Sequence, residues 1–290
     1  MRILCFFVLC SALGCKTQKV VEQNESIESI NEIELGQSED VANSAWAKRE
    51  NKEALAKAIE AWTRITEEKE SAELLVKIAR ARFLYADAFL FEDDVQTRVA
   101  RQEMLLAGSE AAFAALKITS PELIDLEASG ASHKESLLKL TPDSIGALYW
   151  YSVNLARWAR ADGPLRMMRH KGDIRLNLER IRRLDPTFFY GAPERFFGAL
   201  EAATIGLLGG SLERSNAAFE RAIAIAPEYL GNKVVYAKLG AVAKKDRALF
   251  ERLLQEVLSA DPTICEGCAP ENFLEQQKAK RLLARIEKLF

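Results

Sequence analysis

The chain has 290 residues, of which 49% are hydrophobic and 28% are charged, so one or two domains can bury a core. It holds only 15 glycines and 8 prolines, and this shortage of turn residues argues against an all-β fold. The formal net charge of −2 argues against nucleic acid as the main partner, and two histidines leave little room for histidine-based catalysis or a histidine-rich metal site.

The first 14 residues have the features of a bacterial signal peptide. Arg2 supplies a positive charge, and residues 3–13 are almost wholly apolar, over a length too short to span a bilayer. The run Ala12-Leu13-Gly14-Cys15 resembles a lipobox, in which a signal peptidase cuts before a cysteine that accepts a diacylglycerol. We therefore predict a lipoprotein signal peptide over residues 1–14 and lipidation at Cys15. The alternative is an ordinary secretory signal.

Residues 15–40 lack a helical period and are rich in Glu, Gln, Asn and Ser, which is typical of a disordered segment. We predict a flexible tether attached to a membrane by acyl chains, such as palmitate, on Cys15. Export with this anchor would place the body in the bacterial periplasm. Lys16 stands where an Asp often retains lipoproteins in the inner membrane, so the outer membrane is favoured over the inner.

Residues 41–290 have a helical hydrophobic pattern almost throughout, and no run of strand length has a period of two. Ser120-Pro121 and Thr141-Pro142 each place a capping hydroxyl before a proline at the first helical position. Gly209-Gly210-Ser211 is a turn followed by an N-cap residue. We therefore predict one all-α domain over residues 41–290.

The best internal repeat unit ends at Pro227. Phe219, Ala222 and Pro227 have the order and spacing of the second helix of a tetratricopeptide (TPR) repeat, where an aromatic and a small residue let two helices pack closely. This pattern predicts a TPR-like helical repeat array, an α-α superhelix, with degenerate repeats. The alternative is a helical bundle without repeats.

Residues 148–158 form the most unusual segment. Trp150, Asn154 and Trp158 are spaced by four and share one helical face, and Tyr149 adds a further ring. An amide between two indoles can line a pocket for an apolar ligand that makes one polar contact. The alternative is an aromatic core layer in which Asn154 bonds to a neighbouring helix.

An aromatic loop follows a helix stop at Asp185-Pro186, and it contains Tyr190. A new helix starts at Pro193, which places Arg195 in its first turn. A guanidinium at that position can bind a carboxylate in bidentate fashion. The alternative is an ion pair between helices.

The segment 157–183 holds nine Arg or Lys residues against three acids, a net charge of +6. Arg166, Arg169 and Lys171 lie at its centre and are predicted to dock an acidic partner surface. The alternative is a solvated segment without a partner.

Near the end of the chain, Cys265 and Cys268 form a C-x-x-C pattern. A local disulfide is the simplest interpretation for an exported protein. A redox motif would need a thioredoxin-like βαβ context, and zinc would need two further ligands that the sequence does not offer. We predict no metal site and no cofactor.

Many of these residues also carry a resemblance over about 147–290. It rests on the aromatic helix, the aromatic loop, the glycine turn, the TPR-like helix and the last helices: Leu148-Tyr149-Trp150, Asn154, Trp158, Leu184-Asp185-Pro186, Tyr190-Gly191, Pro193, Arg195, Gly198, Gly209-Gly210, Phe219, Ala222, Pro227, Leu249-Phe250, Pro270-Glu271-Asn272 and Phe290. In these the chain resembles the T-component of TRAP transporters, TPR-like lipoproteins of tripartite ATP-independent periplasmic transport. The resemblance implies an all-α body with cryptic TPR motifs, an apolar pore that faces a periplasmic substrate-binding protein, and the capacity to form a ring-like homotrimer.

Together these features predict a lipid-anchored periplasmic accessory component of a TRAP-type solute transport system. It would bind a periplasmic TRAP substrate-binding protein and hold or pass a small, partly apolar ligand through a helical channel. Six residues are the channel candidates: Tyr149, Trp150, Asn154, Trp158, Tyr190 and Arg195. The alternative is a generic TPR lipoprotein scaffold for protein–protein interaction in cell-envelope assembly. The chain has no G-x-S-x-G, H-E-x-x-H or P-loop motif, so we predict that it is not an enzyme.

Overall fold

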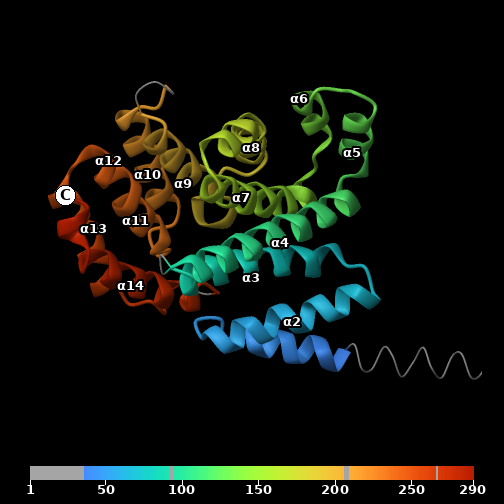
Figure 1. The fold of residues 1–290 in the computed structure, drawn as a ribbon, viewed down its shortest axis with the longest axis horizontal. Helices are drawn as coiled ribbons and strands as arrows, with labels where there is room; N and C mark the ends of the chain where they lie inside the picture. Colours follow the sequence, from blue (N-terminus) through green and yellow to red (C-terminus); the bar gives the residue numbers. More distant parts are fainter. Residues whose placement is uncertain (1–35, 92–93, 206–208, 266) are drawn as a thin grey trace, which may run out of the picture.

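The computed structural model describes residues 36–91, 94–205, 209–265 and 267–290, and within these ranges the chain is helical, with no strand (Figure 1). The prediction of an all-α fold is therefore confirmed. The signal peptide, Cys15 and the tether up to residue 35 lie outside the described residues. The helices that pack as the main layers are α2 (Lys52–Glu68), α3 (Ala72–Phe89), α4 (Val95–Thr119), α7 (Ile145–Asp162), α8 (Pro164–Leu184), α9 (Phe188–Ala203), α10 (Leu212–Ile225), α13 (Arg247–Ser259) and α14 (Ala269–Leu283).

Shorter elements connect these helices. They are α5 (Pro121–Ala128), α6 (His133–Ser136), η1 (Leu137–Lys139), η2 (Pro142–Ser144), α11 (Gly231–Val235), the π-helix η3 (Tyr236–Ala241), α12 (Val242–Lys244) and η4 (Ile286–Lys288).

A further helix covers residues 36–46, so the last five residues assigned to the tether, 36–40, are helical. Its Ala42 and Ala45 are buried in a hydrophobic cluster with Trp62 of α2. This apolar contact with α2 stabilises the helical segment, because packing of an apolar face provides most of the stability of a helix in a protein.

Successive helices pack against one another, and the array curves back on itself. The most extensive contacts join α3 to α4, α4 to α7, α7 to α8 and α9 to α10. In Figure 1 the last helix, α14, returns toward α3. Leu274 of α14 is 1% exposed and belongs to the same hydrophobic cluster as Trp62 and Ile78 of the first helices.

Ser120 and Thr141, each predicted to cap the helix that starts at the following proline, do not do so. Neither the Ser120 nor the Thr141 side chain accepts a hydrogen bond from the helix that follows it. Ser120 instead donates to the Oγ of Ser144 at 2.6 Å, and Ser144 donates to the Thr119 carbonyl at 2.9 Å. Both serines are buried, so their hydroxyls bond to each other to satisfy polar groups inside the fold. The predicted N-cap at Ser211 does accept from the Arg214 N–H.

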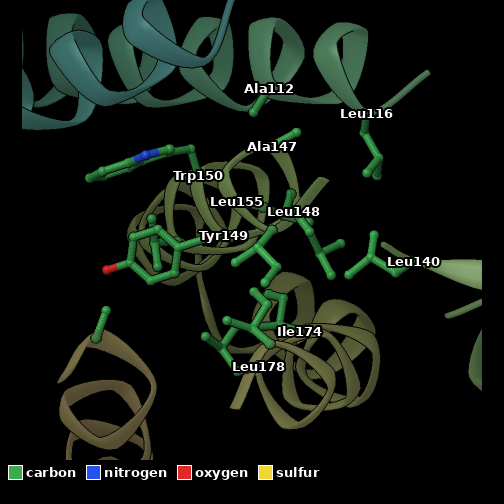
Figure 2. Close-up of a cluster of buried hydrophobic side chains, with 14 of the residues drawn as sticks. Ala112, Leu116, Leu140, Ala147, Leu148, Tyr149, Trp150, Leu155, Ile174 and Leu178 are labelled. Atoms are coloured by element: carbon green, nitrogen blue, oxygen red, sulfur yellow. The ribbon is translucent and has the colours of Figure 1, made fainter. Parts of the chain in front are cut away.

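The largest hydrophobic cluster surrounds α7. Figure 2 shows Leu148, Tyr149 and Trp150 of this helix among residues of α4 and α8, including Ile174 and Leu178. Burial of these side chains fixes α7 at the centre of the molecule. Tyr149 and Trp150, which lie on α7, are therefore held in fixed positions.

The TPR-like unit packs as closely as its small residues predict. Phe219 and Ala222 of α10 are fully buried, and a Cβ placed on Gly198 of α9 would lie 2.8 Å from the Phe219 ring. This close packing of α9 on α10 is compatible with a TPR-like repeat, and the repeat arrangement of the whole array remains a prediction. Within the described ranges no helix is long and apolar enough to cross a membrane.

Candidate functional site

Phe189 lies at the centre of an aromatic cluster built by α7, α9 and the segment before α11. Its ring centroid is 5.1 Å from that of Trp150, 5.9 Å from Tyr149, 5.3 Å from Tyr190 and 5.9 Å from Tyr229. Tyr190 also stacks on Tyr229 at 4.7 Å with nearly parallel planes. The Arg195 guanidinium lies 5.8 Å from the same Phe189 centroid. The structure therefore brings together four of the six channel candidates, around a phenylalanine that the sequence did not single out.

The chain turns through a left-handed conformation at the start of α9. Phe189, Tyr190 and Gly191 have φ values of 43°, 60° and 74°. The left-handed region costs roughly 1–2 kcal/mol for each residue that carries a Cβ, so two aromatic residues in succession store strain. Both aromatic residues of this turn line a pocket together with Arg80 of α3.

Arg195 and Asn232 hold this turn in place. One Arg195 nitrogen donates to the Tyr190 carbonyl at 3.2 Å and to the Asn232 Oδ1 at 2.6 Å. The Asn232 amide donates to the same Tyr190 carbonyl at 3.1 Å. Arg195 is only 9% exposed, and its guanidinium lies over the Tyr229 ring. Arg195, predicted to bind a carboxylate, thus donates to groups inside the protein. Its side-chain partner is the amide of Asn232 and not an acidic residue.

A surface pocket of about 420 Å³ opens beside the left-handed turn, a size that suits a small molecule. Tyr190 is the one channel candidate among its lining residues, which combine aromatic, aliphatic and charged side chains: Arg80, Thr187, Phe189, Tyr190, Ile225, Ala226 and Glu228. The guanidinium that faces this pocket belongs to Arg80, on α3.

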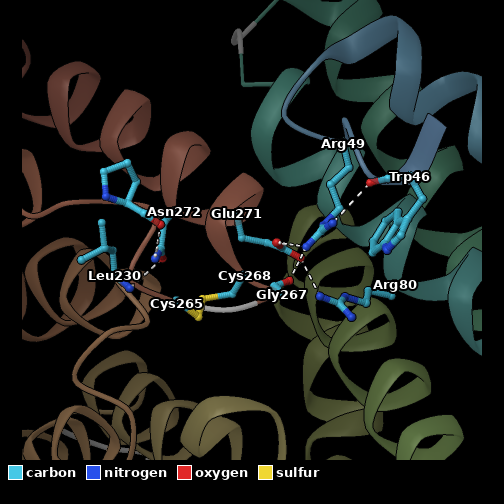
Figure 3. A network of polar contacts seen from close by, with 10 residues as sticks. Trp46, Arg49, Arg80, Leu230, Cys265, Gly267, Cys268, Glu271 and Asn272 are labelled. Atoms are coloured by element: carbon cyan, nitrogen blue, oxygen red, sulfur yellow. Dashed lines mark hydrogen bonds and ion pairs between the residues drawn. A yellow bond between two sulfur atoms is a disulfide. The ribbon is translucent and has the colours of Figure 1, made fainter. Parts of the chain in front are cut away.

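Arg80 belongs to a buried network that joins α14 to the N-terminal helices (Figure 3). Glu271 of α14 accepts from Arg49 at 2.6 Å and from Arg80 at 2.6 Å, and its side chain is 4% exposed. Burial acts to raise the pKa of Glu271, but the hydrogen bond from Arg49 and the charge of Arg80 outweigh it and lower the pKa below its usual value. The carboxylate therefore stays ionised and holds both arginines.

The loop before α14 is fixed on both sides of this network. A disulfide joins Cys265 to Cys268, and the carbonyl of Gly267 accepts from Arg49. Asn272 donates to the Glu228 carbonyl at 2.9 Å and accepts from the Leu230 N–H at 3.0 Å. These bonds attach the segment that carries Glu228 to α14, so the two walls of the pocket are held together.

A second charged cluster lies further along α14. Lys278 donates to Asp87 of α3 at 2.5 Å and to Glu275 at 2.5 Å, and Arg157 of α7 also donates to Asp87. Burial acts to raise the pKa of Asp87, but the charges of Lys278 and Arg157 lower it well below its usual value. Burial raises the pKa of Glu275, whose Oε2 has no hydrogen-bond partner. Three helices therefore meet through ionised groups.

The other two channel candidates lie away from the aromatic cluster. Asn154 is fully buried and donates to the Ala79 carbonyl of α3 at 3.2 Å, as its structural alternative predicted. Trp158 lies at the far end of α7, where the Arg166 guanidinium is 4.6 Å from its ring centroid. The helical spacing placed both on one face, but the two residues contact different neighbours.

The basic segment forms α8, with its charges at the surface. Arg169 is exposed, and it has no ion pair within the described ranges, whereas Arg166 pairs with Asp162. Leu165 and Met168 of the same helix are 85% and 65% exposed. The start of α8 thus presents cationic and apolar side chains together, with Lys171 half-buried beside them.

A row of hydrogen-bonded polar side chains that no sequence pattern indicated joins α6, α7 and α8. His133 contacts Glu127 and, at 2.6 Å, the Asn177 side chain, which donates to the Ser152 hydroxyl at 3.0 Å. Ser152 is fully buried and donates to the Leu148 carbonyl, so it is not available to attack a substrate. These hydrogen bonds join α6, α7 and α8 to one another. In the part of the chain that the structure describes, no three His, Cys, Asp or Glu side chains group to hold a metal ion.

The chain is similar to known proteins over most of its helical body. Residues 52–290 match the family described as TRAP transporter T-component. A protein of Treponema pallidum (strain Nichols), described as an uncharacterized protein, is 24% identical over 218 residues, which are 72% of this chain and 66% of that protein. The chain therefore spans just under two thirds of the length of this relative.

Proposed function

The chain belongs to the TRAP transporter T-component family, and from this we propose that it is a lipid-anchored periplasmic accessory component of a TRAP-type solute transport system. In this role it binds the periplasmic substrate-binding protein of the system and holds a small, partly apolar ligand. The family is one of transport accessory proteins and not of enzymes.

The pocket beside Tyr190 is the observation that supports the ligand-holding role most. Its aromatic wall is set by a strained turn, and strain of this kind persists where the surrounding contacts fix a functional geometry. Arg195 and Asn232 provide those contacts by holding the turn carbonyls. The ligand enters between this wall and α3, with Trp150 and Tyr149 supporting Phe189 from behind.

The start of α8 supports the partner-binding role. Arg169 offers an unpaired cation for an acidic partner, and Leu165 and Met168 offer apolar area beside it. Cationic side chains around exposed apolar ones speed and orient association with a surface of opposite charge. Arg166 and Lys171 extend the positive field of this docking surface.

The anchor belongs to the same proposal. Acylation of Cys15 attaches the protein to the periplasmic face of a membrane, favoured as the outer membrane, while a tether keeps the helical body clear of the lipid. Mass spectrometry of the N-terminal peptide from native membranes tests this directly. A diacylated or triacylated Cys15 supports the anchor, and an unmodified Cys15 contradicts it.

Titration calorimetry with the TRAP substrate-binding protein of the same organism tests the proposed function. The wild-type chain should bind it, and the double variant Arg166→Glu/Arg169→Glu should bind about tenfold more weakly at low salt, because close charge pairs at interfaces contribute 1 kcal/mol or more. The variant Lys57→Glu carries a charge change at an exposed site on α2 and should bind like the wild type. Absence of wild-type binding, or equal loss in both variants, contradicts the proposal.

The same titration separates the alternative function. A generic TPR scaffold for envelope assembly needs a groove for a protein or peptide and no ligand pocket. Such a scaffold would not bind the TRAP substrate-binding protein in this titration. Binding of envelope assembly proteins in place of the substrate-binding protein would therefore favour the scaffold.

A further inference from the structure

We propose that the pocket beside the left-handed turn binds a small zwitterion with an apolar part. Arg80 receives its carboxylate, Glu228 receives its ammonium group, and the rings of Phe189 and Tyr190 pack against its apolar part. The inference rests on the proposed function because it names the class of ligand that the accessory component holds.

Arg80 has unused donors and a surplus charge. Only its Nη2 is bonded, to Glu271 at 2.6 Å, and no acceptor among the described residues takes its Nε or Nη1 hydrogens. Glu271 carries one negative charge and pairs with two guanidinium groups, so among the described residues of this network one positive charge is in surplus. The side chain is 25% exposed at the pocket, where a ligand carboxylate can accept a charge-assisted hydrogen bond from one of these free N–H groups.

The position of Arg80 is fixed before any ligand arrives. Its guanidinium lies 4.9 Å from the Phe189 ring centroid and 5.0 Å from that of Trp46. Two aromatic faces and one carboxylate leave the guanidinium few other orientations. A preorganised donor loses little conformational entropy on binding, and this increases the affinity for a matching anion.

Glu228 supplies the opposite charge on the other side of the pocket. Its carboxylate has no ion pair in the described part of the chain, although it is half-buried. The backbone at this residue is held by Asn272, which donates to the Glu228 carbonyl at 2.9 Å. The carboxylate is thus placed by α14 but left without a cation.

The two charges lie near one another without forming an ion pair. Both line the same pocket, and both act on the hydroxyl of Tyr190, whose pKa is raised mainly by burial and adjusted by the charges of Arg80 and Glu228. Opposite charges that share a pocket and do not meet leave a gap between them. A molecule with one anionic and one cationic group bridges this gap, while an anion or a cation alone leaves one charge unbalanced.

Three probe compounds separate these cases because they share a phenyl ring and differ only in charge. L-phenylalanine carries both charges, 3-phenylpropanoate lacks the ammonium group, and phenethylamine lacks the carboxylate. Titration calorimetry with the full chain should show phenylalanine binding at least about tenfold more tightly than either analogue, because each analogue loses one hydrogen bond between charged groups. Equal affinity for the three probes, or no binding, overturns the proposal.

The variant Glu228→Gln tests the assignment of the ammonium partner. It should remove the preference for phenylalanine over 3-phenylpropanoate and leave the affinity for 3-phenylpropanoate unchanged or higher. Glu60→Gln, at an exposed site on α2, should keep the wild-type preference. An unchanged preference in Glu228→Gln overturns the assignment. The wild-type comparison of the three probes needs no variant, so it decides the ligand class even if a substitution prevents folding.

Partner binding is measured separately, so the two proposals can fail independently. If the substrate-binding protein binds and the probes do not, the zwitterion site is wrong and the accessory role stands. If the probes bind in the expected order and the substrate-binding protein does not, the pocket stands and the proposed function is wrong.

Discussion

Glu271→Ala is the substitution that we expect to loosen α14 from the N-terminal helices most. The Glu271 residue is 3% exposed, and its carboxylate lies 2.6 Å from a nitrogen of Arg49 and 2.6 Å from one of Arg80. Its removal leaves Arg49, which is 5% exposed, as a buried cation without its partner. Breaking a buried pair in this way costs about 3–5 kcal/mol. For a folded body of this size each kcal/mol lowers Tm by about 2–4 °C, so we expect a loss of roughly 10 °C.

Differential scanning calorimetry at neutral pH measures this loss directly. Glu73→Ala is the matched control, because Glu73 pairs with Lys77 at the surface and its side chain is 76% exposed. An exposed pair of this kind contributes little, so the control should unfold within about 2 °C of the wild type. If Glu271→Ala also unfolds within about 2 °C of the wild type, the network does not hold α14 in place and the reasoning fails.

Acid, reduction and a glycine substitution test the same region in other ways. Burial raises the pKa of Glu271, but its two arginines outweigh burial and hold that pKa below 4.5, so the stability that the ionised group provides is lost as the pH falls below that value. Tm measured from about pH 6 to about pH 3 should therefore fall more steeply in the wild type than in Glu271→Gln, and parallel curves would contradict this. Dithiothreitol should lower stability by about 2 kcal/mol, because the Cys265–Cys268 disulfide restricts the unfolded chain; an unchanged urea midpoint would refute this. Gly191→Ala should cost about 1–2 kcal/mol or more in urea unfolding, since Gly191 has a φ of 74° and its added Cβ would lie 3.2 Å from the α10 backbone; a neutral effect would argue against the left-handed turn.

Local features of the sequence predicted the helices well. The hydrophobic period over 41–290 predicted helices, and α4, for example, covers Val95–Thr119. The N-cap at Ser211 was predicted because its hydroxyl bonds within one turn of its own helix. The cap at Ser120 was wrong because its hydroxyl bonds to Ser144, a contact across 24 residues that depends on the tertiary fold. The cap at Thr141 was wrong because its hydroxyl contacts the Ser144 hydroxyl at 3.4 Å and accepts from no backbone N–H of η2.

The candidate site was only partly accessible to sequence reasoning. Tyr190 and Arg195 were chosen because an aromatic loop and an early helical arginine are visible in one short segment. Arg80 and Glu271 are 191 residues apart, so no local pattern shows that they form an ion pair. The left-handed turn was also missed, because aromatic residues disfavour a positive φ and because one of the bonds that hold it comes from Asn232, 42 residues away.

Uptake in living cells tests most directly whether this protein assists a TRAP-type transport system. Cells that lack the gene should take up the solute of their TRAP system more slowly than the parent strain. The wild-type chain should restore uptake, and Arg166→Glu/Arg169→Glu should restore it less. Equal uptake with and without the gene, under conditions where the permease is required, would contradict the accessory role.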